Sequence, residues 1–117
     1  MNVTWRILKD NIVIIIVDID ETIAITPEDR NYANSTPIME NIEVINKLHD
    51  EGNKIIYWTA RGGGSGLDWS ELTYRQIKEW GAKCDDVRVG KPMYDLFICD
   101  KAVNSIDFFA EMLGKKD

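Results

Sequence analysis

Acidic residues crowd the end of the most apolar segment of the chain. Residues 12–17 read IVIIIV, and Asp18, Asp20 and Glu21 follow them. Because Asp18 and Asp20 are two positions apart, their side chains point the same way on an extended segment and can share one site. Two such carboxylates repel each other unless a cation compensates their charge. The spacing therefore predicts a cation-binding pair at the end of a strand.

Three further polar residues are candidates for the same site. Thr59 ends the apolar run KIIYW, Asp100 follows DLFIC, and Lys91 lies in the loop before DLFIC. A third carboxylate would make an oxygen-rich site that suits Mg²⁺, a cation that keeps some of its waters and accepts substrate phosphate. Lys91 cannot ligate a cation and is expected to face an anion beside it. A metal, a lysine and a threonine hydroxyl together indicate phosphate chemistry, in which a carboxylate is a competent nucleophile.

Strands and helices must alternate to bring these residues together. The apolar runs predict buried strands, and helical spacing of apolar residues predicts helices between them. Thr36 is expected to cap the first helix, with Pro37 in its first turn and Gly52 at its end. Such alternation implies a parallel sheet covered on both faces, with ligands beyond the carboxyl ends of the strands. The predicted strands are 12–18, 54–59, 86–89 and 95–99, the helices are 37–51, 69–80 and 104–113, and residues 3–9 are an extra strand or a surface segment.

Composition narrows the class of protein. The chain has 117 residues, 44% of them hydrophobic and 29% charged, which predicts one globular domain spanning 1–117. The net charge is −6 and Lys and Arg form no block, so we expect neither nucleic acid nor an anionic membrane as a partner. No apolar run is long enough to span a membrane, and no signal peptide is evident. Cys84 and Cys99 lack zinc-type spacing, which favours reduced thiols and a cytoplasmic location.

The sequence resembles a known superfamily at four motifs. VDIDET resembles the first motif of the haloacid dehalogenase (HAD) superfamily of phosphatases, an apolar strand followed by Asp-x-Asp-x-Thr. IIYWTAR is similar to its second motif, VGKPMYD to its third and LFICDKAVN to its fourth, in the same order. The TARG, GKPxYD and DKAxN pattern is also similar to small bacterial phosphatases of capsule and surface-sugar synthesis. The resemblance implies a Rossmann-like three-layer α/β sandwich around a parallel sheet and a phosphomonoester hydrolase.

The resemblance assigns a role to each matching residue. Asp18 would attack phosphorus and form an aspartyl-phosphate. Asp20 would protonate the leaving oxygen and then activate water, which is the feature that implies transfer to water. Thr59 and the backbone amide of Ala60 would hold the phosphoryl group, and Lys91 would steady both Asp18 and the phosphate.

The fourth motif departs from the pattern at one position. The resemblance implies that Mg²⁺ is held by the Asp18 carboxylate, the Asp20 backbone carbonyl and Asp100. Similar small phosphatases often have Asp-Asp where this chain has Cys99 and Asp100. Cys99 is expected to be a small buried filler, and Asn104 either a helix cap or a support for a metal-bound water. Loss of one carboxylate leaves a catalytically degenerate relative as one alternative.

No room is left for a cap domain over the site. The predicted helix and strand use most of the chain between Thr22 and Thr59, which leaves 23–36 as a flap that carries Tyr32. The glycine-rich stretch 62–66 is expected to be a flexible loop. A capless site is expected to discriminate poorly among very small phosphate esters and to act on a larger ester with a higher kcat/KM. A homo-oligomer or another partner is expected to wall the site.

Two questions stay open at the level of sequence. Arg61 is equally consistent with a surface salt bridge and with a substrate contact. The second alternative function is a phosphorylatable receiver-like signalling module, which shares the length, the acids, the Thr and the Lys. A receiver needs adjacent acids and an Asp at the end of a later strand, whereas here one residue separates the acids and the later strand ends in Thr59. The expected substrate is a phosphorylated small molecule, such as a sugar phosphate, or a larger phosphate ester.

Overall fold

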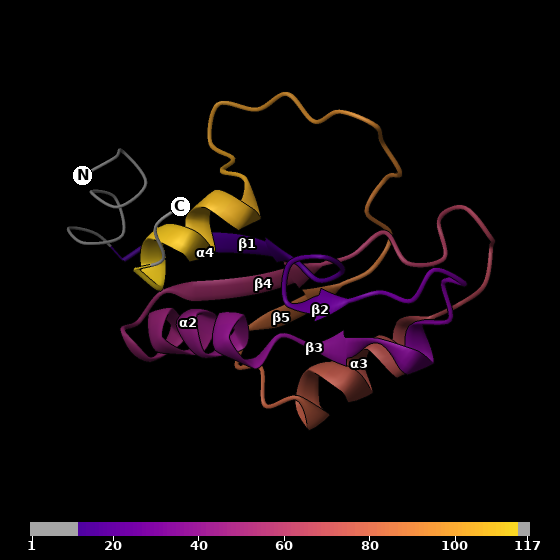
Figure 1. Cartoon of the computed structure of the whole chain (residues 1–117), viewed down its shortest axis with the longest axis horizontal. Helices are drawn as coiled ribbons and strands as arrows, with labels where there is room; N and C mark the ends of the chain where they lie inside the picture. The colour runs from indigo at the N-terminus through magenta and orange to yellow at the C-terminus, as the bar shows by residue number, and fades with distance from the viewer. Residues whose placement is uncertain (1–11, 115–117) are drawn as a thin grey trace.

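A short parallel sheet forms the centre of the molecule. In the computed structural model, which describes residues 12–114, strands β1 (Ile14–Asp18), β4 (Lys54–Trp58) and β5 (Asp86–Arg88) are parallel, in the order β1-β4-β5. The register pairs Ile14 with Lys54 and Asp18 with Trp58, so β1 and β4 end at the same level. The predicted strands at 12–18, 54–59 and 86–89 are confirmed, with shorter bounds, and they lie side by side in Figure 1.

Three helices follow the strands in the alternation that the sequence predicts. They are α2 (Met39–Asp50), α3 (Ser70–Glu79) and α4 (Ser105–Met112). On α2 the residues Ile42, Ile45 and Leu48 recur at helical spacing and are buried. The Asn104 side chain accepts a hydrogen bond from the backbone N–H of Ile106 at 2.9 Å, so it caps α4. Among residues 12–114, no helix is long and apolar enough to cross a bilayer.

The predicted start of the first helix is wrong. Thr36 and Pro37 form strand β3 (Thr36–Pro37), which pairs antiparallel with β2 (Ala24–Ile25), and the helix begins at Met39. The residue at the cap position is Ile38, which makes no side-chain capping bond. Pairing with β2 holds this stretch extended, and that tertiary contact overrides the local capping preference. The small β2–β3 sheet pairs the start of the 23–36 segment with its end.

The core lies between the sheet and the helices. Its fully or almost fully buried members come from β1 and its continuation, the start of the 23–36 segment, α2, β4, α3 and α4, and they include Ile19, Ile23, Ile42, Ile45, Ile55, Tyr57, Ile77 and Phe109. On β1, by contrast, Val17 is buried while Ile14 and Ile16 are 67% and 59% exposed. The expectation that this strand is buried on both faces is therefore wrong. β1 is an edge strand, paired with β4 alone among the described residues.

The predicted strand at 95–99 does not form. Residues 92–104 have no helix or strand, and they arch away from the body of the molecule between β5 and α4 (Figure 1). The apolar residues of this arc are exposed, with Leu96 at 76% and Ile98 at 90%. An apolar run forms a buried strand only where a neighbouring strand makes hydrogen bonds with its backbone N–H and C=O groups. Among the described residues, the 95–99 run has no such neighbour. The predicted strand at 3–9 lies outside the described residues.

Candidate active site

The carboxyl ends of the three parallel strands bring most of the predicted site residues together. Asp18 ends β1, Thr59 follows β4, and Lys91 follows β5. Two backbone hydrogen bonds continue the β4–β5 pairing beyond the strands, from Thr59 N–H to the Arg88 carbonyl at 3.0 Å and from Lys91 N–H to the Thr59 carbonyl at 3.1 Å. These hydrogen bonds join the segments that follow β4 and β5, so the sheet fixes the positions of Thr59 and Lys91.

Asp18 is a partly buried carboxylate beside a lysine. Its Oδ2 lies 3.8 Å from the Lys91 Nζ, and its Oδ1 accepts a hydrogen bond from the Ile19 N–H at 2.9 Å. Burial raises the pKa of Asp18 above its ordinary value, and the charge of Lys91 opposes this effect without cancelling it. The Asp18 side chain is still 41% exposed, so a ligand can reach it from solvent. A reachable carboxylate next to an ammonium group is the arrangement predicted from the sequence.

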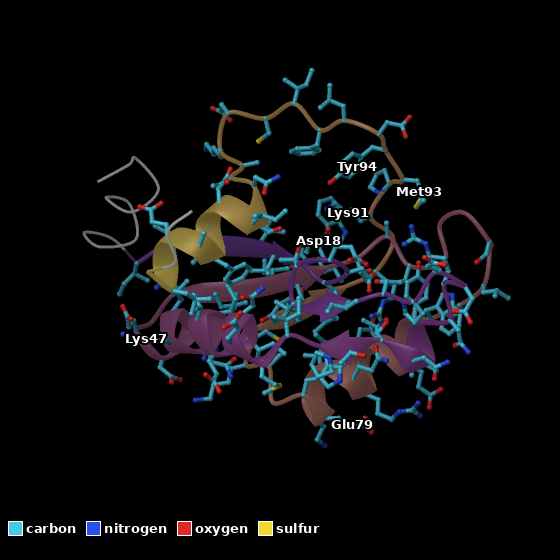
Figure 2. The ribbon with its side chains drawn as sticks, in the orientation of Figure 1. Asp18, Lys47, Glu79, Lys91, Met93 and Tyr94 are labelled. Atoms are coloured by element: carbon cyan, nitrogen blue, oxygen red, sulfur yellow. The ribbon has the colours of Figure 1, made fainter. Side chains whose placement is uncertain are left out.

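Lys91 is held against aromatic rings on one side of Asp18. Its Nζ lies 5.7 Å from the centroid of the Trp58 ring and 5.2 Å from that of Tyr94, and the side chain is only 13% exposed. Figure 2 shows Lys91 between Asp18 and Tyr94. An apolar pocket of about 160 Å³ is lined by Trp58, Lys91, Pro92, Tyr94 and Phe97. The ammonium is therefore pointed at Asp18 by rings that restrict it.

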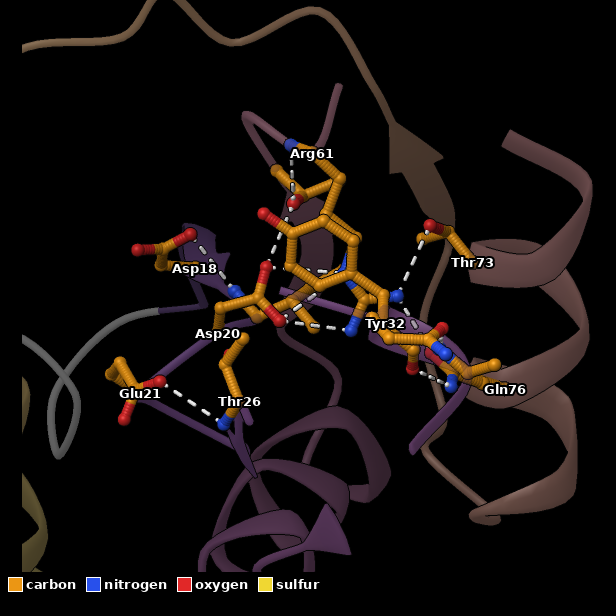
Figure 3. Close-up of polar contacts among 12 residues, drawn as sticks. Asp18, Asp20, Glu21, Thr26, Tyr32, Arg61, Thr73 and Gln76 are labelled. Atoms are coloured by element: carbon orange, nitrogen blue, oxygen red, sulfur yellow. Dashed lines mark hydrogen bonds and ion pairs between the residues drawn. The ribbon is translucent and has the colours of Figure 1, made fainter. Parts of the chain in front are cut away.

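Asp20 is bound by Arg61 through both carboxylate oxygens. Arg61 Nε donates to Asp20 Oδ1 and Oδ2 at 3.2 and 3.1 Å, and Nη2 donates to Oδ1 at 2.9 Å (Figure 3). The third nitrogen, Nη1, donates to Gln76 Oε1 at 2.6 Å and to Thr73 Oγ1 at 3.3 Å, and the guanidinium stacks on the Tyr32 ring at 4.7 Å. Of the two interpretations of Arg61, the salt bridge is the one observed, but it is internal, because the Arg61 side chain is 0% exposed.

Thr59 faces inward toward the same pair. It is completely buried, and its hydroxyl oxygen lies 3.4 Å from Asp20 Oδ2 and accepts a hydrogen bond from the Arg61 N–H at 3.2 Å.

A glycine-rich turn follows Thr59. The carbonyl of Ala60 accepts a hydrogen bond from the Gly63 N–H at 3.0 Å, and the turn begins there. A Cβ on Gly62, whose φ is +85°, would lie 2.1 Å from the Leu67 carbonyl oxygen. The 62–66 stretch is thus a tight turn that glycine makes possible.

Asp100 does not join the other acids. It lies on the exposed arc, with its neighbour Cys99 also exposed. Within the described part of the chain no group of three His, Cys, Asp or Glu side chains is placed to hold a metal ion. The side chains of Asp18, Asp20 and Asp100 therefore do not form a metal-binding group by themselves, and the predicted Mg²⁺ site, which uses the backbone carbonyl of Asp20, stays a prediction. The prediction that Cys99 is a small buried filler is wrong: Cys99 is exposed, because the 95–99 strand that would have buried it does not form.

Sequence reasoning missed two residues of this network. Thr73 and Gln76 lie three positions apart on α3, on the face that also buries Ile77, and both are buried. A polar side chain on the buried face of a helix needs a buried hydrogen-bond partner. Thr73 and Gln76 therefore indicate that such a partner lies against α3. That partner is Arg61. The signal predicts that a partner exists but not which residue it is.

Comparison with known proteins supports the fold and leaves the function open. No protein-family model matches the chain, and no curated protein matches it. A crystal structure of a structural-genomics target from Vibrio cholerae is similar to it, with a TM-score of 0.70 and 24% sequence identity over 89% of this chain and 96% of that one. The similarity shows a shared fold. With its three parallel strands and three helices, this fold is a mixed α/β architecture consistent with a Rossmann-like arrangement.

Proposed function

We propose that the chain is a phosphoric monoester hydrolase in which Asp18 is the nucleophile. The observation that carries the proposal is the Asp18–Lys91 pair, 3.8 Å apart at the carboxyl edge of a parallel sheet, where ligands of such sheets bind. A carboxylate can attack phosphorus, and a fixed positive charge beside it stabilises the negative oxygens of the phosphoryl group. The exposed fraction of Asp18 leaves room for that approach.

The proposed reaction has two steps. In the first, an Asp18 oxygen attacks phosphorus, the bond from phosphorus to the ester oxygen breaks, and Asp20 supplies the proton with which the alcohol leaves. In the second, Asp20 takes a proton from water, the water oxygen attacks phosphorus, and the bond from phosphorus to the Asp18 oxygen breaks, which releases inorganic phosphate and the free Asp18 carboxylate. Lys91 would balance the charge of the phosphoryl group in both steps. The Ala60 amide is the proposed contact that orients it, and Thr59, which is buried with its hydroxyl toward Asp20, would act through Asp20.

The four motifs support assignment to the HAD superfamily as a capless member. A sugar phosphate or a related metabolite in the cytoplasm is the proposed substrate, because the motif pattern is similar to phosphatases of surface-sugar synthesis. Mg²⁺ is the proposed cofactor, and when bound it would offset the charge of the acids and of the substrate phosphate. The described arrangement holds Asp100 apart from Asp18 and Asp20, so none of the steps above is assigned to the metal.

Hydrolysis of an aryl phosphate by purified protein tests the proposal directly. Wild type should release nitrophenol from nitrophenyl phosphate, and Asp18→Asn should lower turnover by several orders of magnitude, because the amide is a far poorer nucleophile. Asp86→Asn is the matched control, since Asp86 pairs with Arg88 at the surface. An Asp18→Asn protein that keeps about a tenth of wild-type turnover would refute the assignment. Parallel assays with Mg²⁺ and with a chelator test the cofactor, and a panel of sugar phosphates tests the substrate class.

A further inference from the structure

Arg61 has no free surface with which to bind a substrate. All three of its guanidinium nitrogens donate hydrogen bonds inside the protein, and its side chain is 0% exposed. Its strongest contact is the two-nitrogen, two-oxygen pairing with Asp20, whose side chain is 18% exposed. Such a bidentate pairing fixes the plane of a carboxylate as well as its position. If Arg61 contributes to a reaction, it does so through Asp20.

Arg61 is itself held by two parts of the chain that are distant in sequence. Gln76 on α3 accepts from its Nη1 at 2.6 Å, and the Tyr32 ring lies against its face at 4.7 Å. Gln76 also donates from Nε2 to the Tyr32 carbonyl at 2.7 Å, which closes the contact between α3 and the 23–36 segment. Gln76 and Tyr32 therefore enclose the guanidinium of Arg61 and leave it one orientation, with Nε and Nη2 toward Asp20 (Figure 3).

We infer that Arg61 is a positioning residue that sets the orientation of the Asp20 carboxylate, and that Gln76 and Tyr32 set the orientation of Arg61. This inference rests on the proposed phosphatase function. A group that transfers a proton must lie within hydrogen-bond reach of the reacting oxygen, and a shift of about 1 Å lowers the rate strongly. Asp20 lies on a short turn after β1, where it makes an isolated bridge with Ala24. The bridge holds the backbone of Asp20, and the Arg61 guanidinium holds its carboxylate.

The inference is tested by the dependence of the rate on the leaving group. Nitrophenolate leaves as a stable anion and needs little protonation, whereas an alkyl alcohol leaves only with a proton. The value of kcat/KM reports formation of the aspartyl-phosphate, in which that proton is delivered. Arg61→Gln should therefore lower kcat/KM for an alkyl phosphate about 10- to 100-fold more than for nitrophenyl phosphate. A merely structural role would lower both values by the same factor.

A double-mutant cycle with Asp20→Asn separates the two roles further. If Arg61 acts through Asp20, adding Arg61→Gln to Asp20→Asn should change kcat/KM for the alkyl ester by less than about threefold. Arg75→Gln on α3 is the matched control, because Arg75 pairs with Glu79 at the surface and should leave both esters unaffected. If Arg61→Gln does not fold, Gln76→Leu removes the support of Arg61 and keeps the Arg61–Asp20 pair. It should give a smaller difference of the same sign.

Each outcome is decisive. A larger loss on the alkyl ester, together with a non-additive cycle, supports the positioning role. Equal losses on the two esters in Arg61→Gln or in Gln76→Leu, or an additive cycle, overturn that role and leave the phosphatase function intact. Absence of turnover by wild type on both esters overturns the proposed function, and the role of Arg61 with it.

Discussion

Replacing Lys91 by methionine removes the ammonium that faces Asp18 and keeps most of the side-chain volume. Because Lys91 lowers the pKa of Asp18 while burial raises it, the substitution should raise that pKa further. The nucleophile must be ionised, so the acidic side of the pH profile of kcat/KM should move to higher pH. The loss of activity should therefore be larger in mildly acidic buffer than in alkaline buffer.

The distance between the two groups sets the size of the effect. Two unit charges 3.8 Å apart attract with about 1 kcal/mol in water and about 4 kcal/mol in a medium typical of a protein surface. Since the Asp18 side chain is 41% exposed, solvent screens the pair, and about 1 to 2 kcal/mol is the appropriate range. That energy corresponds to a loss of about 5- to 30-fold in kcat/KM on the acidic limb of the pH profile, where Asp18 is largely protonated.

The assay is kcat/KM for nitrophenyl phosphate measured from about pH 4 to about pH 8. Lys83→Met is the control, because it makes the same change in net charge at an exposed pair with Asp50. Lys91→Arg keeps the positive charge and should retain the wild-type position of the acidic limb. A Lys91→Met protein whose acidic limb coincides with that of wild type would show that the pair has no influence on the nucleophile.

Three further predictions concern stability. Burial raises the pKa of Asp18 above its ordinary value of 3.8, so the native state binds this proton more tightly than the unfolded state, and stability is lost as pH rises through that window. The melting temperature of Asp18→Asn minus that of wild type should therefore be more positive at neutral pH than below about pH 3. An equal difference at both pH values would contradict this. Cys99→Asp should change the free energy of unfolding by less than about 0.5 kcal/mol because Cys99 is exposed, and a loss above about 3 kcal/mol in urea unfolding would show a buried site instead. Tyr57→Phe should keep or raise the free energy of unfolding, by up to about 1 kcal/mol, because the buried Tyr57 hydroxyl has no hydrogen-bond partner among the described residues; a clear decrease would reveal one.

Local sequence signals predict most of the elements and most of the site. The apolar runs before Asp18 and Thr59 are local signals of strands, and the spacing of Ile42, Ile45 and Leu48 is a local signal of a helix. Alternation of strands and helices implies a parallel sheet, and parallel strands end at one edge. For that reason the order of residues along the chain is enough to predict that Asp18, Asp20, Thr59 and Lys91 lie together.

The contacts of these residues depend on how distant segments pack together. The sequence alone did not distinguish a surface salt bridge from a substrate contact for Arg61, because the long arginine side chain can reach either. Its partners Thr73 and Gln76 lie on α3, and local sequence patterns do not predict how this helix packs against the sheet. The same holds for the 95–99 run: its residues have the apolar character of a buried strand, but a strand exists only where another strand meets its backbone. Asp100 and Cys99 therefore lie in solvent. Local periodicity fixes the conformation that a segment prefers, whereas contacts between distant segments decide whether that conformation forms and what it touches.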